Sequence, residues 1–340
     1  MTTNASPSVL VIVLNYRTPE LSLRAAEAAL GAMEGIAGRI VIVDNASGDA
    51  SARIIGEGIA ARGWDRVTLL QSPRNGGFGA GNNFGMRAAA SLPGGAAHDF
   101  VYILNSDAQP RPDALRALLA ALEADPSAGM AGSRTIGEDG VLHRTAFRFP
   151  SILGEFEGAV RTGIFTRLLR DWVVPLPVPE ETARVDWVAG ASLLLRARML
   201  EEVGLFDEAF FLYYEETDLS LRAARAGWTC LYVPASEVMH IGSVSTGMRA
   251  WARTPSYWFD SRLHYFVQNH GRAYAVAATL SRAAGEALWR LRCLLTGRAR
   301  RDPPRFLRDL LAHGLRRVWA CRSRRVIRPS RAALAKGANP

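Results

Sequence analysis

Acidic, amide and histidine side chains recur in this sequence directly after apolar, strand-like runs or at the start of an amphipathic helical stretch. These clusters are residues 44–47, 105–107 and 215–218, and His240. Ligands of open α/β sheets bind in the crevice beyond the carboxyl ends of the strands, where such clusters would meet. Carboxylates and a histidine there could hold a metal ion, a diphosphate and a reacting hydroxyl. The pattern therefore indicates chemistry on a nucleotide-activated substrate.

The elements that would position these clusters alternate between strand-like and helical patterns over residues 8–107. Residues 9–14 are a continuous apolar run short enough for a buried parallel strand, and residues 40–43, 67–70 and 100–104 are the next three predicted strands. Pro19 suits the first turn of the helix that follows the first run. Strands alternating with helices predict parallel βαβ units. The expected fold class is α/β, with a mixed sheet flanked by helices.

The rest of the chain divides into three regions. Residues 148–183 are rich in proline and irregular, which predicts an insertion or mobile loop beside the site, on the side of a second substrate. A helix is expected over residues 217–226, ending at Gly227. From residue 257 the pattern is helical and rich in arginine. We therefore expect a catalytic domain over residues 1–256 and a helical C-terminal region over residues 257–340.

The net charge of +9 is unevenly distributed, because residues 281–340 contain 16 Arg or Lys and three acids. Basic helices that also carry Trp, Phe and Leu lie in the plane of a membrane interface. We therefore expect residues 281–340 to bind an anionic membrane surface. The alternative is that these helices pack on the catalytic domain and their arginines are solvated. No nucleic-acid partner is expected, since no recognition motif accompanies the charge.

The three cysteines bear on the redox state of the compartment in which the protein works. Cys230, Cys293 and Cys321 form no CxxC pair, which argues against a zinc ribbon or a disulfide framework and fits a reducing compartment. The N-terminal residues lack the pattern of a secretory signal, and no apolar run reaches the length of an ordinary spanning helix. We expect a cytoplasmic protein that is peripheral at the inner face of the plasma membrane.

Each cluster also has a plain structural interpretation. Residues 44–48 are typical of a turn with helix capping, and residues 105–107 of an Asx-turn. His240 alone could be a core histidine, and the acids of residues 215–218 suit the positive end of a helix dipole. The aromatic run at residues 210–214 favours a functional role for those acids, because partial desolvation raises the pKa of a carboxyl group towards that of a general base.

Residues 75–83 are rich in glycine and asparagine at a loop-to-helix junction. Such junctions let the backbone approach a ligand and present N–H groups to anions. The segment superficially resembles a dinucleotide-binding fingerprint. However, it follows the third strand and its spacing is GxGxG, which argues against a dehydrogenase.

Taken together, these segments resemble the inverting glycosyltransferases of family 2, which have the Rossmann-like GT-A fold, and most closely the bacterial rhamnosyltransferase-like branch. The resemblance runs in order over roughly residues 8–247. It is carried by residues 11–16, 43–47, 75–83, 104–107, 190–191, 204–208, 214–228 and 240–243. Each piece is weak, whereas the order and spacing of all of them are specific.

The resemblance implies a role for each cluster. Asp44 would read a pyrimidine base, and Asp107, the last residue of the family's DxD motif, would bind Mg²⁺ or Mn²⁺ together with His240. Glu216 would be the general base. Glu215 and Asp218 would support Glu216 in catalysis. The remaining residues of the nucleotide-sugar pocket would be Asn15, Arg17, Asn45, Asn75, Gly77, Asn82, Asn105 and Ser106.

Two positions depart from the family pattern. Asn105 occupies the first DxD position, so metal binding would rest more on Asp107. Glu216 stands where aspartate is common. The implied reaction is a single in-line displacement that moves a sugar from a dTDP- or UDP-linked donor, with dTDP-L-rhamnose preferred, to a glycan or lipid-linked glycan in cell-surface polysaccharide synthesis.

Two other classes of protein remain to be weighed. Sugar-nucleotide pyrophosphorylases use lysines on phosphates, and the single lysine of this chain is Lys336, near its end. A non-catalytic scaffold protein on the same fold would bind a nucleotide sugar without turning it over. Nucleotide release from a panel of donors would distinguish these classes.

Overall fold

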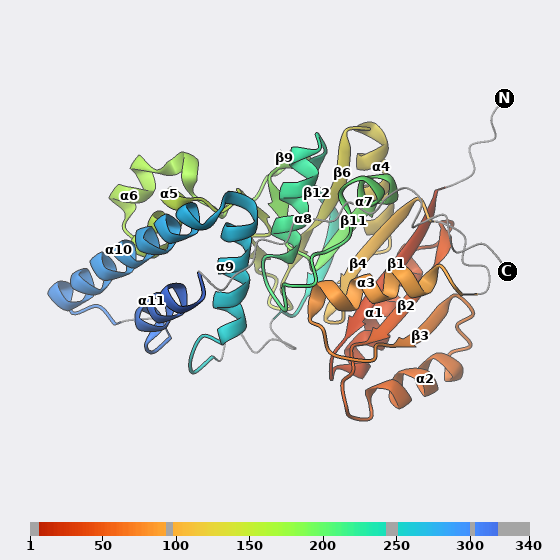
Figure 1. Cartoon of the computed structure of the whole chain (residues 1–340). Coiled ribbons are helices and arrows are strands. Elements are labelled where there is room, and N and C mark those ends of the chain that lie inside the picture. Colours follow the sequence, from red (N-terminus) through yellow and green to blue (C-terminus); the bar gives the residue numbers. More distant parts are fainter. Residues whose placement is uncertain (1–6, 93–97, 243–250, 300–302, 319–340) are drawn as a thin grey trace.

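The computed structural model describes residues 7–92, 98–242, 251–299 and 303–318 (Figure 1). A mixed β-sheet lies at its centre, with the strand order β3-β2-β1-β4-β11-β6-β12-β5, while β7 pairs with β6 and β9 with β12. The strands are β1 (Ser8–Asn15), β2 (Ala37–Asp44), β3 (Val67–Gln71), β4 (Phe100–Asn105), β5 (Ala108–Pro110), β6 (Ala128–Ile136), β7 (Leu142–His143), β9 (Ala183–Val185), β11 (Ser192–Arg196) and β12 (Thr229–His240). Two short strands, β8 (Ala146–Phe147) and β10 (Trp187–Val188), form a separate antiparallel pair.

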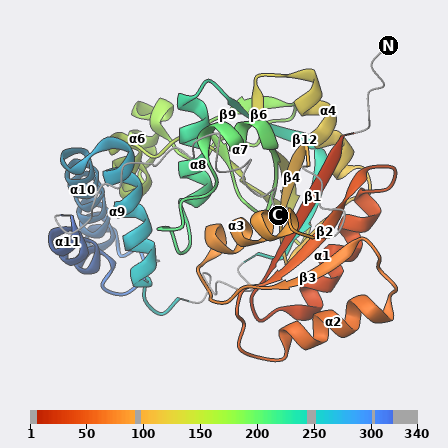
Figure 2. The same ribbon diagram turned by 45° about the vertical axis from the view of Figure 1, so that its right-hand side comes forward.

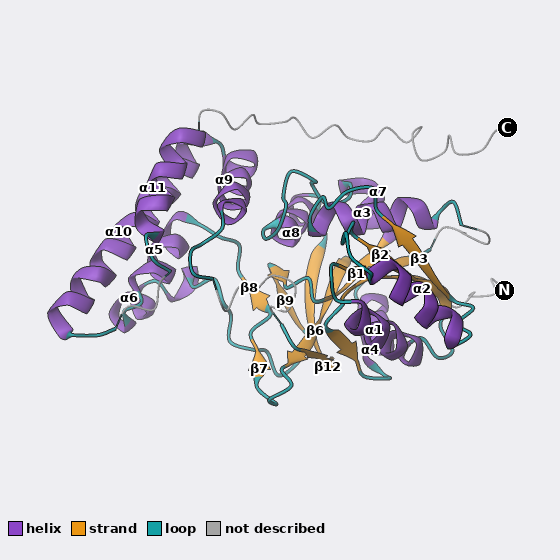
Figure 3. Ribbon diagram, turned by 90° about the horizontal axis from the view of Figure 1, so that it is seen from below, coloured by secondary structure: helices purple, strands orange, loops and turns teal. Residues whose placement is uncertain are grey.

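The predicted parallel units are confirmed. Strands β3, β2, β1 and β4 are parallel to one another. Strand β1 is apolar between its ends because both faces of the sheet are covered: Val11 and its alternate neighbours belong to one core, and Leu10 and Ile12 belong to the other. Figure 3 shows one helix layer on each face. The layers consist of α1 (Pro19–Ala32), α2 (Ser51–Ala61) and α4 (Ala114–Ala124), and of α3 (Phe78–Ala89), α7 (Ala197–Val203) and α8 (Glu215–Arg225).

The second half of the sheet is mixed, and its directions decide where the site lies. Strand β11 is antiparallel to both β4 and β6, and β12 is parallel to β6. Strand β12 therefore runs in the same direction as β4. As a result, the carboxyl ends of β1, β2, β4 and β12 lie at one edge of the sheet.

The expectation of an irregular loop over residues 148–183 is wrong for residues 152–172. This stretch forms α5 (Ile152–Val160), α6 (Gly163–Leu168) and a 3₁₀ turn, η1 (Arg170–Trp172). Ser151 caps α5 by accepting the Gly154 N–H at 3.1 Å. The prolines that suggested irregularity lie outside these helices, because Pro150 precedes the cap and the others follow η1.

Three C-terminal helices, α9 (Ser256–His270), α10 (Arg272–Thr296) and α11 (Phe306–Arg317), stand beside the sheet in Figure 2. With α5 and α6 they form what we call the helical unit. Arg262 of α9 and Arg282 of α10 both donate to the buried Glu155 of α5, at 2.8 and 3.3 Å respectively. No helix within the described ranges is long and apolar enough to span a membrane. Residues 319–340 of the predicted membrane-binding tail lie outside the described residues.

Candidate active site

The ends of β1 and β2 bring Asn15 and Asp44, both predicted to bind the nucleotide, into direct contact. The Asn15 amide donates to Asp44 Oδ1 at 2.7 Å and to Ser47 Oγ at 3.2 Å. Arg17 joins the same turn, because its backbone N–H donates to Ser47 Oγ and its Nε to the Ser47 carbonyl, both at 3.0 Å. Asp44 Oδ2 receives a long bond of 3.4 Å from the Ser47 N–H. That oxygen retains capacity to accept an N–H from a ligand such as a pyrimidine base.

The glycine-rich junction before α3 lies against this turn. The Asn45 amide donates to Asn75 Oδ1 at 3.0 Å and to the Gly77 carbonyl at 3.2 Å. Gly77 has φ 89°, and a Cβ there would lie 1.8 Å from the Phe211 carbonyl oxygen, so the backbone approach requires glycine. The Oδ1 atoms of Asn45 and Asn82 are buried and have no hydrogen-bond partner among the described residues. Buried unpaired acceptors of this kind favour a polar ligand that donates to them.

Asn105, Asp107 and His240 converge at the ends of β4 and β12. His240 Nε2 lies 3.1 Å from Asp107 Oδ1 and 3.3 Å from Asn105 Nδ2, and Asp107 Oδ2 accepts the Gly242 N–H at 3.0 Å. Burial opposes ionisation of Asp107, but the hydrogen bonds from His240 and the backbone outweigh it and lower the pKa of this carboxyl group. An ionised carboxylate is the form that binds a cation.

The fit of this trio to a divalent cation can be judged from its spacing and chemistry. Adjacent ligands of an octahedral cation with bonds of about 2.1 Å lie roughly 3.0 Å apart, which matches the separation of Asp107 and His240. Among the described residues, however, no group of three or more His, Cys, Asp or Glu side chains is placed to hold a metal. The two side chains can therefore supply only part of a coordination shell, and diphosphate and water oxygens would have to supply the rest.

Ser106 connects the two strand-end clusters. Its hydroxyl lies 3.0 Å from Thr18 Oγ1, and the Thr18 N–H donates to Asn15 Oδ1 at 3.2 Å. Thr18 therefore connects the hydrogen bonds around Asn15 and Asp44 with the loop that carries Asp107.

Glu215 and Glu216 begin α8 and have different surroundings. Glu215 is 2% exposed, whereas Glu216 is half-buried and its Oε1 accepts the Gly190 N–H at 3.4 Å. The Oε2 atom of each is buried and has no hydrogen-bond partner within the described ranges. Burial raises the pKa of Glu216, and burial together with the charge of Glu216 raises the pKa of Glu215 well above its usual range. The more accessible Glu216 is thus the better placed to take a proton from a substrate.

Comparison with known proteins identifies the family of this chain. A model described as "Glycosyltransferase like family 2" matches residues 7–274. The chain belongs to glycosyltransferase family 2. It is 32% identical over 216 residues to the N-acetylglucosaminyl-diphospho-decaprenol L-rhamnosyltransferase of Mycobacterium tuberculosis, an alignment that covers 61% of this chain and 68% of that protein. Rhamnosyltransferase WbbL of Escherichia coli K12 is 29% identical over 165 residues, with coverages of 48% and 60%.

Solved structures confirm the predicted GT-A fold. The mannosyltransferase PcManGT of Pyrobaculum calidifontis, in complex with GDP-Man and Mn²⁺, has a TM-score of 0.53 at 18% identity and covers 94% of this chain and 89% of its own. GalNAc-T7 with UDP, GalNAc and Mn²⁺ also has a TM-score of 0.53, at 14% identity, and covers 93% and 56% respectively. At these identities the likeness concerns the fold.

Asp218 of this glycosyltransferase, predicted to support the base, faces away from Glu216. Its Oδ2 accepts Arg222 Nε at 2.8 Å and its Oδ1 accepts Asn269 Nδ2 at 2.7 Å, and Asp218 is 1% exposed. The carboxylate therefore joins α8 to α9. It can position the base through the helix, without contact with a substrate.

Gly190 and Ala191 also lie at the candidate site, although no role was predicted for them from the sequence. While the Gly190 N–H donates to Glu216, the Ala191 carbonyl accepts the Asn105 N–H at 3.0 Å. This short chain segment thus contacts both Glu216, the predicted general base, and Asn105, next to the predicted metal ligands. The available signal was the glycine that interrupts the strand-like run over residues 185–195.

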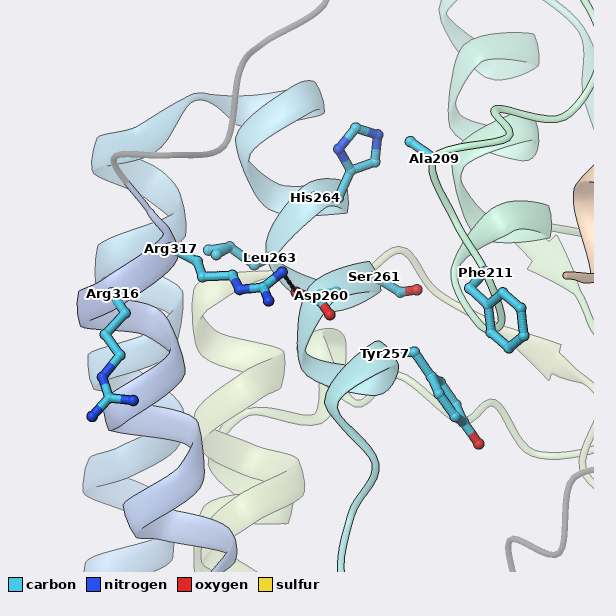
Figure 4. Close-up of a pocket in the computed structure, with 9 residues that line it drawn as sticks. All are labelled: Ala209, Phe211, Tyr257, Asp260, Ser261, Leu263, His264, Arg316 and Arg317. Carbon is cyan, nitrogen blue, oxygen red and sulfur yellow. Dashed lines mark hydrogen bonds and ion pairs between the residues drawn. The ribbon is translucent and has the colours of Figure 1, made fainter. Parts of the chain in front are cut away.

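A hollow of about 660 Å³ lies beside the segment that precedes α8, between it and helices α9 and α11 (Figure 4). Phe211 and Tyr257 line it, together with Asp260, which is bound to Arg317 at 2.7 Å. It contains none of the predicted site residues, although Phe211 also contacts the Gly77 loop through its backbone. The hollow therefore adjoins the glycine-rich loop from the side of the helical unit.

Proposed function

We propose that this protein is an inverting, metal-dependent glycosyltransferase that moves L-rhamnose from dTDP-L-rhamnose to a hydroxyl group of a lipid-linked glycan in cell-surface polysaccharide synthesis. We further propose that it works at the cytoplasmic face of the plasma membrane. The observation that carries the catalytic part is Glu216, a half-buried carboxylate with a raised pKa and a free oxygen, next to the segment that contacts Asn105.

The chain's own residues suffice for the proton transfer. In the proposed step the acceptor oxygen attacks the anomeric carbon, and its proton passes to the Glu216 carboxylate. The bond from the anomeric carbon to the diphosphate oxygen breaks, and the nucleoside diphosphate leaves with both electrons. A single displacement of this kind inverts the anomeric configuration. The base contributes most when its pKa approaches the working pH, which the burial of Glu216 favours.

Asp107 and His240 are the residues that would hold Mg²⁺ or Mn²⁺. The spacing of their ligand atoms supports this assignment, as does the Mn²⁺ in the complexes of PcManGT and GalNAc-T7. The cation would neutralise the charge that develops on the diphosphate leaving group. The Asn105 amide lies 3.3 Å from Nε2 and would have to give up that contact when Nε2 binds the cation.

The names of the relatives support the proposed donor and acceptor. The names of both relatives describe rhamnosyltransferases, and that of the mycobacterial enzyme specifies an N-acetylglucosaminyl-diphospho-decaprenol acceptor. We propose a polyprenyl-diphosphate-linked acceptor of the same class. UDP-hexoses are the second choice of donor, because the pocket around Asp44 suits either pyrimidine.

Release of nucleoside diphosphate from a panel of nucleotide sugars tests the proposal, with a polyprenyl-diphospho-N-acetylglucosamine acceptor and Mg²⁺ or Mn²⁺. We expect release from dTDP-L-rhamnose that depends on acceptor and cation, and that is lost with EDTA and in Asp107→Ala. Asp113→Ala, an exposed acid without a capping bond, is the matched control and should behave as wild type. Full activity in EDTA would contradict metal dependence, and donor binding without release from any sugar would identify a scaffold protein.

A further inference from the structure

The outward face of α10 is apolar along almost its whole length. Every exposed residue between positions 273 and 295 is alanine, valine or leucine. The large ones are Val276, Leu280, Leu288, Leu291, Leu294 and Leu295, with exposed fractions of 39%, 58%, 44%, 52%, 70% and 78%. At about 100° per residue these positions share one face of the helix, and the stripe is roughly 33 Å long at about 1.5 Å per residue. A solvated helix face is normally polar, so this stripe requires a partner.

The opposite face of α10 is already occupied, so the stripe is not its packing surface within the helical unit. Ala278, Gly285 and Cys293 are buried. A Cβ on Gly285 would lie 2.7 Å from the Phe156 carbonyl oxygen, which shows how closely α10 packs against α5. Figure 1 shows the C-terminal end of α10 pointing away from the sheet.

The apolar surface continues onto α6. Arg292 Nη1 donates to Thr162 Oγ1 at 2.8 Å, which holds the start of α6 beside the C-terminal half of α10. In α6, Ile164 is 70% exposed and Leu168 is 72% exposed, and Trp172 of η1 is 46% exposed. Two neighbouring elements thus expose bulky apolar side chains.

Charge decides which partner fits. The single carboxylate of α10, Glu286, is 0% exposed, so the exposed surface of this helix offers apolar and cationic groups. Arg290 and Arg298 lie beside the stripe, and Arg167 is exposed on α6. Long arginine side chains next to apolar residues can extend to phosphate groups while their stems remain on the apolar surface.

This charge disfavours two other occupants. If a second copy of the chain packed on this face, the arginines of one copy would lie against the same arginines of the other. Residues 319–340 of this chain also carry arginines and no acid, so they too would be repelled. An anionic bilayer supplies both an apolar layer for the leucines and phosphates for the arginines.

We propose that the outward face of α10, continued by α6, is the surface by which this protein docks on an anionic lipid bilayer. The inference rests on the proposed function to the extent that a lipid-linked acceptor requires the enzyme at a membrane. It also assigns the membrane contact to described helices, whereas the sequence analysis assigned it to the whole basic region 281–340.

Vesicle flotation of the full chain tests the inference, with phosphatidylglycerol–phosphatidylcholine vesicles compared with phosphatidylcholine alone. The wild-type protein should float with the anionic vesicles. A triple variant, Leu291→Gln with Leu294→Gln and Leu295→Gln, should bind them at least about tenfold more weakly, because binding scales with buried apolar area. The matched control is Val141→Gln, which changes a 55% exposed valine next to β7 and should float as wild type.

Two further variants exclude the alternatives. Arg290→Gln with Arg298→Gln should weaken binding to anionic vesicles and reduce its sensitivity to salt. A tail variant, Arg324→Gln with Arg325→Gln and Arg328→Gln, should keep most of the binding. Loss of flotation in the tail variant while the leucine variant floats normally would overturn the proposal.

The oligomeric state and donor binding complete the test. A wild-type dimer that the leucine variant splits, with unchanged vesicle binding, would identify the face as a contact between copies and overturn the proposal. Binding of dTDP-L-rhamnose should be the same in the wild type and the leucine variant, because α10 does not contribute to the donor pocket. If the wild type does not turn over the donor at all, the proposed function is wrong, but the membrane-docking result still holds.

Discussion

Glu216 and Glu215 are adjacent residues whose surroundings assign them different tasks. Glu216→Gln removes the proton acceptor while keeping the shape of the side chain and its contact with Gly190. We expect donor affinity to stay near wild type and kcat to fall by roughly 10²–10⁴, the usual effect of losing a general base. Titration calorimetry with the donor and steady-state release of nucleotide would measure the two quantities separately.

The pH dependence of kcat provides a second test of Glu216 as the general base. Burial raises the pKa of Glu216, and only the ionised form accepts a proton. Activity in the wild type should therefore rise with pH through a value above the ordinary glutamate pKa of about 4.3. If Glu216→Gln is nearly normal and Glu215→Gln is inactive, the base is the neighbouring residue and our assignment is wrong.

Glu215 should reduce stability at neutral pH. Its pKa is raised well above the usual range by burial and by the charge of Glu216, so the folded state holds the proton more tightly than the unfolded state. The stability that this protonated form contributes is fully present below the unfolded pKa and is lost as pH rises towards the folded pKa. Glu215→Gln removes that loss. We expect a larger free energy of unfolding than wild type at pH 8 and no gain at pH 4, as measured by urea unfolding.

The site residues that could be predicted from the sequence are those that directly follow strands. Asp107 and His240 both lie at strand ends, but β11 and β6 separate β4 from β12, and the two side chains meet because β5 pairs antiparallel with the end of β12. The contacts of Gly190 with Glu216 and of Ser106 with Thr18 could not be foreseen. They depend on how loops far apart in the sequence fold over the strand ends, which hydrophobic periodicity does not encode.

At the scale of elements, the segment before α8 stores strain beside the base. Tyr213 and Tyr214 have φ of 71° and 72°, in a region that costs roughly 1–2 kcal/mol per non-glycine residue. Aromatic packing holds them there: Tyr214 lies 5.4 Å from Tyr265 and Tyr213 lies 6.4 Å from Tyr257, measured between ring centroids. Such strain at a catalytic helix start is consistent with a conformation selected for function.

The loop before α3 offers a sharp test of backbone fit. Gly77→Ala would place a Cβ 1.8 Å from the Phe211 carbonyl oxygen, so the loop must move away from the segment that leads to Glu215. We expect weaker donor binding and a loss of stability beyond the backbone strain alone. Thermal unfolding and donor titration measure both effects.

Gly204→Ala is the matched control for Gly77→Ala. Gly204 has φ 84° and ψ 172°, close to the 89° and −172° of Gly77, but its added Cβ would meet nothing nearer than an arginine nitrogen at 3.9 Å. It therefore measures the conformational cost without the clash. Equal losses of stability in the two variants would show that the contact with Phe211 is unimportant.

The elements differ in how well the sequence predicts them. The strands β1, β2 and β4 contain continuous apolar runs buried on both faces, whereas the edge strand β3 includes Thr68 and is only partly buried. Helices α5 and α6 were missed because prolines and glycines surround them. Their order comes from packing, such as that of Gly285 in α10 against α5, between segments far apart in the chain.

At the scale of the whole molecule, the helical unit supports helix α8. Ser261 of α9 donates to the Leu212 carbonyl at 2.9 Å, and His264 Nε2 lies 2.8 Å from Asp207 Oδ2. Asn269 reaches Asp218 of α8 in the same way. Helix α9 therefore holds both the segment before α8 and α8 itself. The predicted division into a domain of residues 1–256 and a C-terminal region remains a prediction, but the two regions are in direct contact at the base.

Arg262 is the residue on which this support depends most. It is 2% exposed, donates to Glu155 at 3.0 and 2.8 Å and to Thr279 Oγ1 at 3.1 Å, and so joins α9 to α5 and α10. Arg262→Met keeps most of the volume and removes the charge. Glu155 would keep only its 3.3 Å contact with Arg282, so we expect a loss in the free energy of unfolding of up to about 3–5 kcal/mol, the usual cost of removing one partner of a buried ion pair.

The pH dependence of that loss follows from Glu155. Burial opposes its ionisation, but Arg262 and Arg282 outweigh burial and lower its pKa. Its stabilising contribution is therefore present above the unfolded pKa and is lost as pH falls through the folded pKa. The difference in the free energy of unfolding between wild type and Arg262→Met should be largest near pH 7 and should become smaller in acid.

The double variant with Glu155→Gln removes both charges and should recover part of the stability. A strictly additive double-mutant cycle would contradict the ion pair. Helix α9 also contacts Leu212 and Asp207, which precede α8. Arg262→Met should therefore lower kcat even at temperatures well below the unfolding of the sheet, and it should change donor affinity little.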